Sequence, residues 1–176
     1  RTAPTVASFS AATPTRGSPI TYALTFSEPV SGLTPSGLSI SGTSTGWAVS
    51  AVRGSGTTYS IDVGNGSPAD GTVVLALASG AVSDAAGNAG PAATAGTVTV
   101  DVTAPTATWT SPGSPTNASA PAFTLAFDAP VTGLLGTEVT NAGTAAGCSF
   151  TPSASSGTTV TVTATGCGEG TVAPRL

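Results

Sequence analysis

The sequence predicts an all-β protein made of two tandem β-sandwiches, and an internal repeat is the main reason. Three pairs of matching segments define the repeat: Thr2–Thr5 with Thr103–Thr106, Gly56–Thr58 with Gly157–Thr159, and Gly71–Val73 with Gly170–Val172. The first two pairs lie 101 residues apart and the third 99 residues apart. A nearly constant offset indicates one structural unit used twice, and each copy is long enough to have its own core. We therefore expect domain 1 over residues 1–101 and domain 2 over residues 102–176.

Composition supports short strands and excludes several classes of function. The 176 residues include 23 Gly and 14 Pro and only 7% charged residues, a mixture that disfavours long helices and favours strands joined by turns. The chain has no Lys and four scattered Arg, so we expect no nucleic-acid partner and no binding to anionic membranes. No apolar run approaches the roughly 20 residues that a membrane-spanning helix needs. His is absent, which removes the Ser-His-Asp and Cys-His mechanisms, and we expect no enzymatic activity.

Alternation of apolar and polar residues predicts the strands of domain 1. In residues 20–26, Ile20, Tyr22, Leu24 and Phe26 alternate with small polar residues, as in a strand with one buried face. The other strands are expected at 5–9, 37–41, 47–53, 57–63, 72–77 and 97–100, with a tight turn at 54–56. Such closely spaced short strands with turn signals between them are typical of a β-sandwich.

Domain 2 repeats this plan but ends early. Its strands are expected at 107–110, 122–127, 138–140, 148–153, 158–163 and from 170 onward. The loop and last strand that occupy residues 79–101 in domain 1 have no counterpart, so we expect the second sandwich to lack its last strand. Two explanations remain open: the sequence is a piece of a longer chain, or another subunit donates the strand.

Three segments resemble the bacterial immunoglobulin-like (Ig-like) repeats of surface and secreted proteins: residues 26–33 (FSEPVSGL), 81–88 (AVSDAAGN) and 101–105 (DVTAP). The resemblance implies Ig-like Greek-key sandwiches and a non-enzymatic spacer or stalk in an extracellular or cell-surface bacterial protein, such as an adhesin. The implied partners are flanking repeats of the same chain or identical chains, with a host-surface or carbohydrate target bound through other domains. The alternatives are a segment of an assembled fibre completed by strand exchange, and a carbohydrate-binding accessory module of a secreted hydrolase.

Five side chains are candidate ligands at two calcium sites at domain junctions, the first with Glu28, Asp84 and Asn88 and the second with Asp101 and Asp128. We expect Glu28 in the loop after the second strand and Asp84 and Asn88 in the last loop, and these loops share one end of an Ig-type sandwich. Asp101 closes the last strand of domain 1, and Asp128 lies in the domain 2 loop that matches the loop of Glu28. Clustered oxygen ligands suit Ca²⁺, which takes 6–8 oxygens. The alternative is that Asp84 and Asn88 only stabilise a turn.

Four further acidic residues have no consistent partners between the two copies: Asp62, Asp70, Glu138 and Glu169. We expect them to be solvated or to stabilise turns. A carboxylate pair for glycoside hydrolysis would also need a cleft, which narrow sandwiches with short loops seldom have.

The two cysteines are expected to form a disulfide. Cys148 aligns with Trp47 of domain 1, and Cys167 follows the fifth strand, so both fall at the same end of the sandwich. A bridge here would contribute about 3 kcal/mol in the chain-entropy model and would suit an oxidising compartment. In domain 1, the buried ring of Trp47 would do the same work by packing. The alternative is a pair of buried free thiols.

Overall fold

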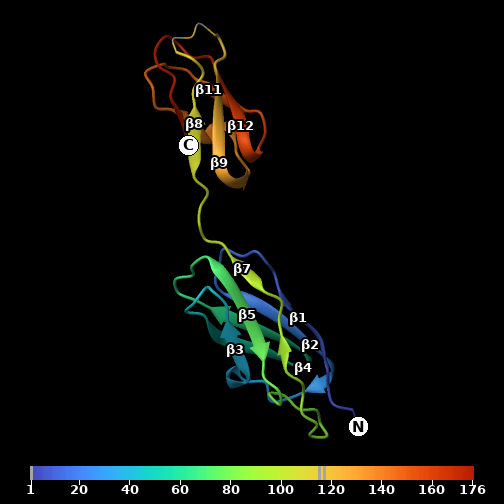
Figure 1. Cartoon of the computed structure of the whole chain (residues 1–176). Helices are drawn as coiled ribbons and strands as arrows, with labels where there is room; N and C mark the ends of the chain where they lie inside the picture. The colour runs from blue at the N-terminus through green and yellow to red at the C-terminus, as the bar shows by residue number, and fades with distance from the viewer. Residues whose placement is uncertain (1, 115, 117) are drawn as a thin grey trace. The chain divides into compact units, whose positions relative to one another are not determined.

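The computed structural model describes residues 2–114, 116 and 118–176 (Figure 1). The chain divides into two compact units, Arg1–Thr103 (unit 1) and Ala104–Leu176 (unit 2). Over the described residues, the regular structure is β-strand apart from two short 3-10 helices, η1 (Pro35–Gly37) and η2 (Gly136–Glu138). The prediction of an all-β protein is confirmed.

Unit 1 consists of two antiparallel sheets that share one core. Its strands are β1 (Val6–Ala11), β2 (Ile20–Val30), β3 (Leu38–Ser41), β4 (Ala48–Gly64), β5 (Gly71–Leu77), β6 (Ala93–Thr94) and β7 (Val98–Val100). One sheet has the order β1-β2-β4, and in the other sheet β3, β6 and β7 all pair with β5. Buried side chains of both sheets belong to one hydrophobic cluster, as in a sandwich.

The predicted inward face of the second strand is correct, but the strand is longer than predicted. Tyr22 and Leu24 are fully buried and pack in the core with Leu75 of the opposite sheet. β2 continues to Val30 because the pairing with β4 resumes after a register shift, with Val30 opposite Gly56. The irregular stretch breaks the alternation of apolar and polar residues, which is why the pattern suggested an earlier end.

β4 is one continuous element from Ala48 to Gly64, yet the chain reverses direction within it. Arg53 and Asp62 are nine residues apart and form an ion pair, whereas a straight strand would separate them by about 30 Å. Gly54 and Gly56 have φ values of +100° and +69°, which place them in the left-handed region. The two predicted strands are therefore the arms of one hairpin, with the turn at the predicted glycines.

Unit 2 contains a four-stranded antiparallel sheet and a small two-stranded one. Its strands are β8 (Ala107–Thr110), β9 (Ala122–Thr132), β10 (Thr140–Asn141), β11 (Ser149–Pro152), β12 (Ser156–Thr165) and β13 (Pro174–Arg175). The large sheet has the order β11-β12-β9-β8, and β10 pairs with β13. The strand expected from residue 170 is wrong in extent, since regular pairing begins only at Pro174.

A pair of threonines forms the same contact in both units, which we call the threonine clasp. In unit 1, the backbone N–H of Thr72 donates to Oγ1 of Thr43 at 2.9 Å, and the two hydroxyl oxygens are 3.2 Å apart. In unit 2, the N–H of Thr171 donates to Oγ1 of Thr144 at 2.9 Å, and the hydroxyl oxygens are 3.1 Å apart. The first threonines of the two clasps are 101 residues apart, and the second threonines are 99 residues apart. Unit 2 is therefore two residues shorter between them. Since the match at 101 continues to Thr159, the two residues are lost after Thr159, toward the loop that follows β12.

The glycine before each clasp is required by space as well as by conformation. Gly71 has φ +148°, and a Cβ there would lie 2.7 Å from Oγ1 of Thr43. Gly170 has φ +135°, and a Cβ there would lie 2.7 Å from Oγ1 of Thr144. The repeated Gly-Thr-Val segment is therefore explained by close approach of two backbone segments.

Candidate functional site

The predicted acidic cluster of unit 1 is partly assembled. The carboxylate of Asp84 accepts hydrogen bonds from the backbone N–H groups of Ala86 and Asn88, both at 2.8 Å, and from Nδ2 of Asn88 at 2.7 Å. Glu28 lies in β2 and not in a loop as predicted, because β2 continues to Val30. Glu28 and Asp84 nevertheless line one hollow of about 360 Å³. The structure thus brings together the three residues named for unit 1.

These contacts are those of a turn closed by its own side chains. Within the described residues, no group of three or more His, Cys, Asp or Glu side chains is close enough to hold a metal ion. Binding of Ca²⁺ stays a prediction that names the oxygen atoms of Glu28, Asp84 and Asn88 as ligands.

Asp128 holds the chain segment that leads into β8. Its Oδ1 accepts the N–H of Thr106 at 2.8 Å, and its Oδ2 accepts the hydroxyl of Thr106 at 2.6 Å. The side-chain and backbone hydrogen bonds from Thr106 lower the pKa of Asp128. Asp128 lies in β9 and not in a loop, which corrects the prediction. In unit 1 the equivalent residue is Ser27, and its hydroxyl oxygen accepts the N–H of Thr5 at 2.9 Å. This is one hydrogen bond to an uncharged group, whereas Asp128 accepts two.

Asp101 and Asp70 lie at the C-terminal end of unit 1. The N–H of Asp101 donates to the backbone oxygen of Thr15 at 2.9 Å, so its backbone continues the β7 pairing. The Oδ1 of Asp70 accepts the N–H of Val102 at 2.6 Å, and its Oδ2 accepts the hydroxyl of Thr103. These hydrogen bonds lower the pKa of Asp70, and the bond from the Thr103 side chain is the largest cause. Asp70 is exposed, as expected, and in addition it binds Val102 and Thr103, which lie 32 and 33 residues further along the chain.

The carboxylates of Asp70 and Asp128 form equivalent contacts on the two sides of the Ala104-Pro105 dipeptide. Each binds a backbone N–H and a threonine hydroxyl next to the dipeptide. We call them the linker clamps. The sequence signal for them was the repeated Thr-Ala-Pro-Thr segment, which has a hydroxyl on each side of the dipeptide.

Asp62 is a buried acidic residue that sequence reasoning placed on the surface. It is 9% exposed and accepts a hydrogen bond from the hydroxyl of Thr21 at 2.9 Å. The guanidinium of Arg53 donates to its other oxygen, and this bond is the main cause of its lowered pKa. The hairpin brings Arg53 back beside Asp62, a contact that strand alternation does not reveal.

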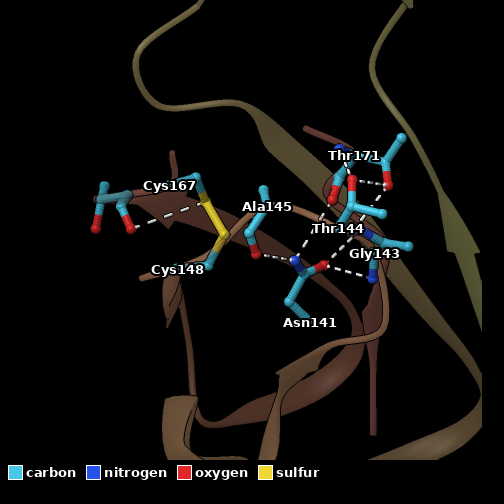
Figure 2. Close-up of a disulfide and its surroundings, with 9 residues drawn as sticks. Asn141, Gly143, Thr144, Ala145, Cys148, Cys167 and Thr171 are labelled. Carbon is cyan, nitrogen blue, oxygen red and sulfur yellow. Dashed lines mark hydrogen bonds between the residues drawn. A yellow bond between two sulfur atoms is a disulfide. The ribbon is translucent and has the colours of Figure 1, made fainter. Parts of the chain in front are cut away.

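A disulfide joins Cys148 and Cys167, as predicted, across 19 residues of sequence (Figure 2). Beside it, Asn141 donates through Nδ2 to the backbone oxygen of Ala145 at 2.8 Å and accepts the N–H of Gly143 at 3.0 Å (Figure 2). The bridge therefore connects the segment before β11 to the loop after β12.

Trp47 makes the corresponding connection in unit 1. Its Nε1 donates to Oγ of Ser44 at 2.9 Å, and Oγ of Ser44 donates to the backbone oxygen of Ala69 at 2.7 Å. The indole ring is 9% exposed and belongs to the core. Packing and a two-step hydrogen-bond chain thus replace the covalent bridge.

A comparison with protein families decides the identity of unit 1. The family described as bacterial Ig-like domain matches residues 1–100. The chain belongs to the bacterial Ig-like domain family. The two-sheet order of unit 1, with β1, β2 and β4 in one sheet and β3, β5 and β7 in the other, is the strand arrangement expected of an Ig-like domain.

Comparison with solved structures gives one weaker likeness. The bacterial Ig-like chain is similar to the N-terminal part of the bacterial S-layer protein SbsC, with 16% identity and a TM-score of 0.40. The alignment covers 72% of this chain and 41% of that chain. No curated protein matches the chain significantly. The described residues include no helix that is long and apolar enough to cross a bilayer.

Proposed function

We propose that this chain is a non-enzymatic structural spacer of a bacterial surface or extracellular protein, with two tandem Ig-like sandwiches. Membership of the bacterial Ig-like family supports the Ig fold of unit 1. The threonine clasp, present in both units, supports the same fold for unit 2. A repeated module of this kind provides length between other parts of a protein.

The linker clamps are the observation that carries the spacer proposal. Asp70 fixes Thr103 and Asp128 fixes Thr106, which leaves only Ala104 and Pro105 between the fixed residues. Proline fixes its own φ and restricts the residue before it to extended conformations. A short connection of this kind has few conformations, as a part that keeps other domains at a distance requires.

The disulfide supports an extracellular location. Structural disulfides persist in oxidising compartments and are rare in the bacterial cytosol. The bridge between Cys148 and Cys167 takes the place of the tryptophan of unit 1, so unit 2 depends on it for the stability that Trp47 supplies by packing.

The structure gives less support to a carbohydrate-binding module. Such a module presents aromatic faces to its ligand, whereas Trp47, Tyr22, Tyr59 and Phe26 are buried in the core. Trp109 packs partly buried against the core of unit 2. Among the described residues, the exposed large hydrophobic side chains are Val102, Leu135 and Leu176, none of them aromatic.

The spacer proposal is tested by the distance between the units. Spin labels are attached to Ser55→Cys and Ser155→Cys, which are exposed positions in units 1 and 2, with the native disulfide kept oxidised. Pulsed electron resonance should give a narrow distance distribution that broadens when Asp70 and Asp128 are both replaced by Ala. Glu169→Ala, which removes an exposed acidic residue outside the clamps, is the matched control. A broad distribution in the unaltered chain would contradict the proposal.

A further inference from the structure

Asn65 lies directly after β4 and connects three segments of unit 1. Its backbone N–H donates to Oγ of Ser18 at 2.8 Å, in the segment before β2. Its Nδ2 donates to the backbone oxygen of Thr45 at 2.8 Å, in the segment before β4. Its Oδ1 accepts the backbone N–H of Ser67 at 2.9 Å, which closes a turn in its own loop. Both polar atoms of the side-chain amide are therefore hydrogen-bonded.

The bond from Asn65 to Thr45 is a second connection at the end of unit 1 that Trp47 closes. Ser44 accepts the indole N–H of Trp47 and donates to the backbone oxygen of Ala69. Ser44 and Thr45 thus hold the two ends of the loop that follows β4. The amide of Asn65 is the part of this closure that chemistry can remove.

Unit 2 makes the equivalent connection without an amide side chain. At the offset of 101, Asn65 corresponds to Gly166 and Thr45 corresponds to Ala146. The oxygen of Ala146 accepts the backbone N–H of Gly168 at 2.8 Å. A backbone donor in unit 2 therefore takes the place of the side-chain donor in unit 1.

The residue that follows Asn65 makes its side chain reactive. Asn65 is followed by Gly66, whereas Ala follows the other asparagines, which are Asn88, Asn117 and Asn141. Glycine has no Cβ to hinder the approach of its backbone nitrogen to Cγ of the preceding asparagine. Gly66 is exposed, and even a Cβ there would meet no atom within 4 Å. The surroundings of Gly66 therefore leave this approach open.

We propose that Asn65 is a deamidation site, and that loss of its side-chain amide loosens the end of unit 1 that Trp47 closes. The backbone nitrogen of Gly66 attacks Cγ of Asn65 and forms an N–Cγ bond. The Cγ–Nδ2 bond breaks, and Nδ2 leaves as ammonia with the proton that the nitrogen of Gly66 loses. Water then opens the cyclic imide at either carbonyl, which gives aspartate or isoaspartate. The inference does not depend on the spacer proposal.

The folded structure restrains the first step. Attack makes Cγ tetrahedral, so Oδ1 and Nδ2 must leave the positions in which they bind Ser67 and Thr45. Two hydrogen bonds of ordinary net strength slow the reaction about tenfold or more. Local opening of the loop releases Asn65 and removes this restraint. Deamidation therefore accumulates with the time that the loop spends open.

Neither product restores the bond to Thr45. An ionised carboxylate only accepts hydrogen bonds, so it cannot donate to the oxygen of Thr45, and it places a negative charge beside that oxygen. Isoaspartate also lengthens the backbone by one methylene group, which displaces the turn that Ser67 closes. Because the ammonia is lost, each conversion remains as a lasting loss of stability in unit 1.

The reaction is tested on the complete 176-residue chain with its disulfide oxidised. The chain is kept at mildly alkaline pH with and without urea, and peptide mapping by mass spectrometry follows the conversion of each asparagine. In urea, Asn65 should convert several times faster than Asn141. Without urea, the conversion of Asn65 should be slower than in urea by about tenfold or more.

Asn141 is the matched comparison within the same chain. Its Nδ2 donates to the oxygen of Ala145 at 2.8 Å, and its Oδ1 accepts the N–H of Gly143 at 3.0 Å. These contacts resemble those of Asn65, but the next residue is Ala142. A difference between the two asparagines in urea therefore reports the effect of the following residue.

Two variants separate the chemistry from its consequence. Gly66→Ala should slow the conversion several-fold and keep the fold, since Gly66 has a negative φ and room for a Cβ. Asn65→Asp reproduces one product, and it should lower the urea midpoint of unit 1 and leave that of unit 2 unchanged. Ser55→Asp adds the same charge at an exposed position of unit 1 and should leave both midpoints unchanged.

Three results would overturn the inference. They are equal conversion of Asn65 and Asn141 in urea, equal conversion of Asn65 with and without urea, and an Asn65→Asp chain whose unit 1 has the midpoint of the unaltered chain. If Gly66→Ala does not fold, the comparison in urea still tests the chemistry, because it uses the unaltered chain.

Discussion

Trp47 and Cys148 occupy equivalent positions in the two units, and each ties the segment before a hairpin to the loop that follows it. The tryptophan does so by burial and through the oxygen of Ser44, and the cysteine does so by a bond to Cys167. The same structural requirement, closing one end of a sandwich, is thus met by two different chemistries in one chain.

The first prediction concerns the redox dependence of stability. Reduction of the disulfide should lower the free energy of unfolding of unit 2 by about 3 kcal/mol, because the unfolded chain regains loop entropy. Unit 1 has no cysteine and should be unaffected. Urea unfolding is carried out with and without dithiothreitol, and amide exchange reports the free energy of unfolding of each unit separately. A reductant-dependent change in unit 1 would contradict it.

The second prediction concerns Trp47. Trp47→Ala should cost unit 1 about 3–5 kcal/mol, because it removes a buried ring and leaves Ser44 without the indole donor. Trp47→Phe separates the two effects, since it keeps most of the ring and loses only the N–H. We expect Trp47→Phe to lower the free energy of unfolding of unit 1 by about 1–3 kcal/mol, as measured from denaturation midpoints.

The third prediction concerns acid stability. The pKa values of Asp62, Asp70 and Asp128 are lowered in the folded protein, mainly by hydrogen bonds from Arg53, Thr103 and Thr106 respectively. A lowered folded-state pKa adds stability above the unfolded value of about 3.9, and this stability is lost as the pH falls through the folded value. Asp62→Asn should therefore reduce the change in the urea midpoint of unit 1 between pH 6 and pH 2.

The control for acid stability is Glu169→Gln, at an exposed carboxyl group. It should leave the pH dependence of both units unchanged. If Asp62→Asn and Glu169→Gln behave alike, the hydrogen-bonded carboxylate is not the source of the effect.

The fourth prediction uses the threonine clasp to compare the two units. Thr43→Val and Thr144→Val each remove an Oγ1 that accepts a backbone N–H. Each should destabilise its own unit by about 1 kcal/mol, because one partner of a hydrogen bond is lost. Equal costs measured by denaturation would show that the contact is energetically equivalent in both copies, whereas a cost in one unit alone would contradict this.

The fifth prediction separates the two roles of the acidic cluster. If Asp84 acts only through its hydrogen bonds to Ala86 and Asn88, Asp84→Ala should destabilise unit 1 equally in EDTA and in Ca²⁺. If Ca²⁺ binds, it should raise the melting temperature of the unaltered chain, and both Asp84→Ala and Glu28→Gln should remove that rise. Differential scanning calorimetry decides between the two outcomes.

Alternation and repetition were sufficient to predict the buried faces and the disulfide. Ile20, Tyr22 and Leu24 are buried as predicted, because a strand with one core face repeats every two residues. The extension of β2 through Glu28 to Val30 could not be predicted, because a register shift interrupts this period.

Trp109 illustrates the same limit. It lies opposite Leu125, as Phe9 lies opposite the equivalent Leu24, although the two aromatic residues are 100 and not 101 residues apart. A bulge in β1 between Val6 and Ser8 accounts for the difference. Contacts between distant side chains, such as Arg53 with Asp62 and Asp70 with Thr103, were also outside the reach of the pattern, because they depend on how loops return in space.

The covalent loop in unit 2 has a mechanical consequence. When the chain is pulled from its ends, the 19-residue span between Cys148 and Cys167 cannot be stretched while the bond is intact. At roughly 3.5 Å per residue, this withholds about 60 Å of extension that a reduced chain would release. Under tension, an oxidised unit 2 therefore stays shorter after it unfolds, which limits how far attached domains can be drawn apart.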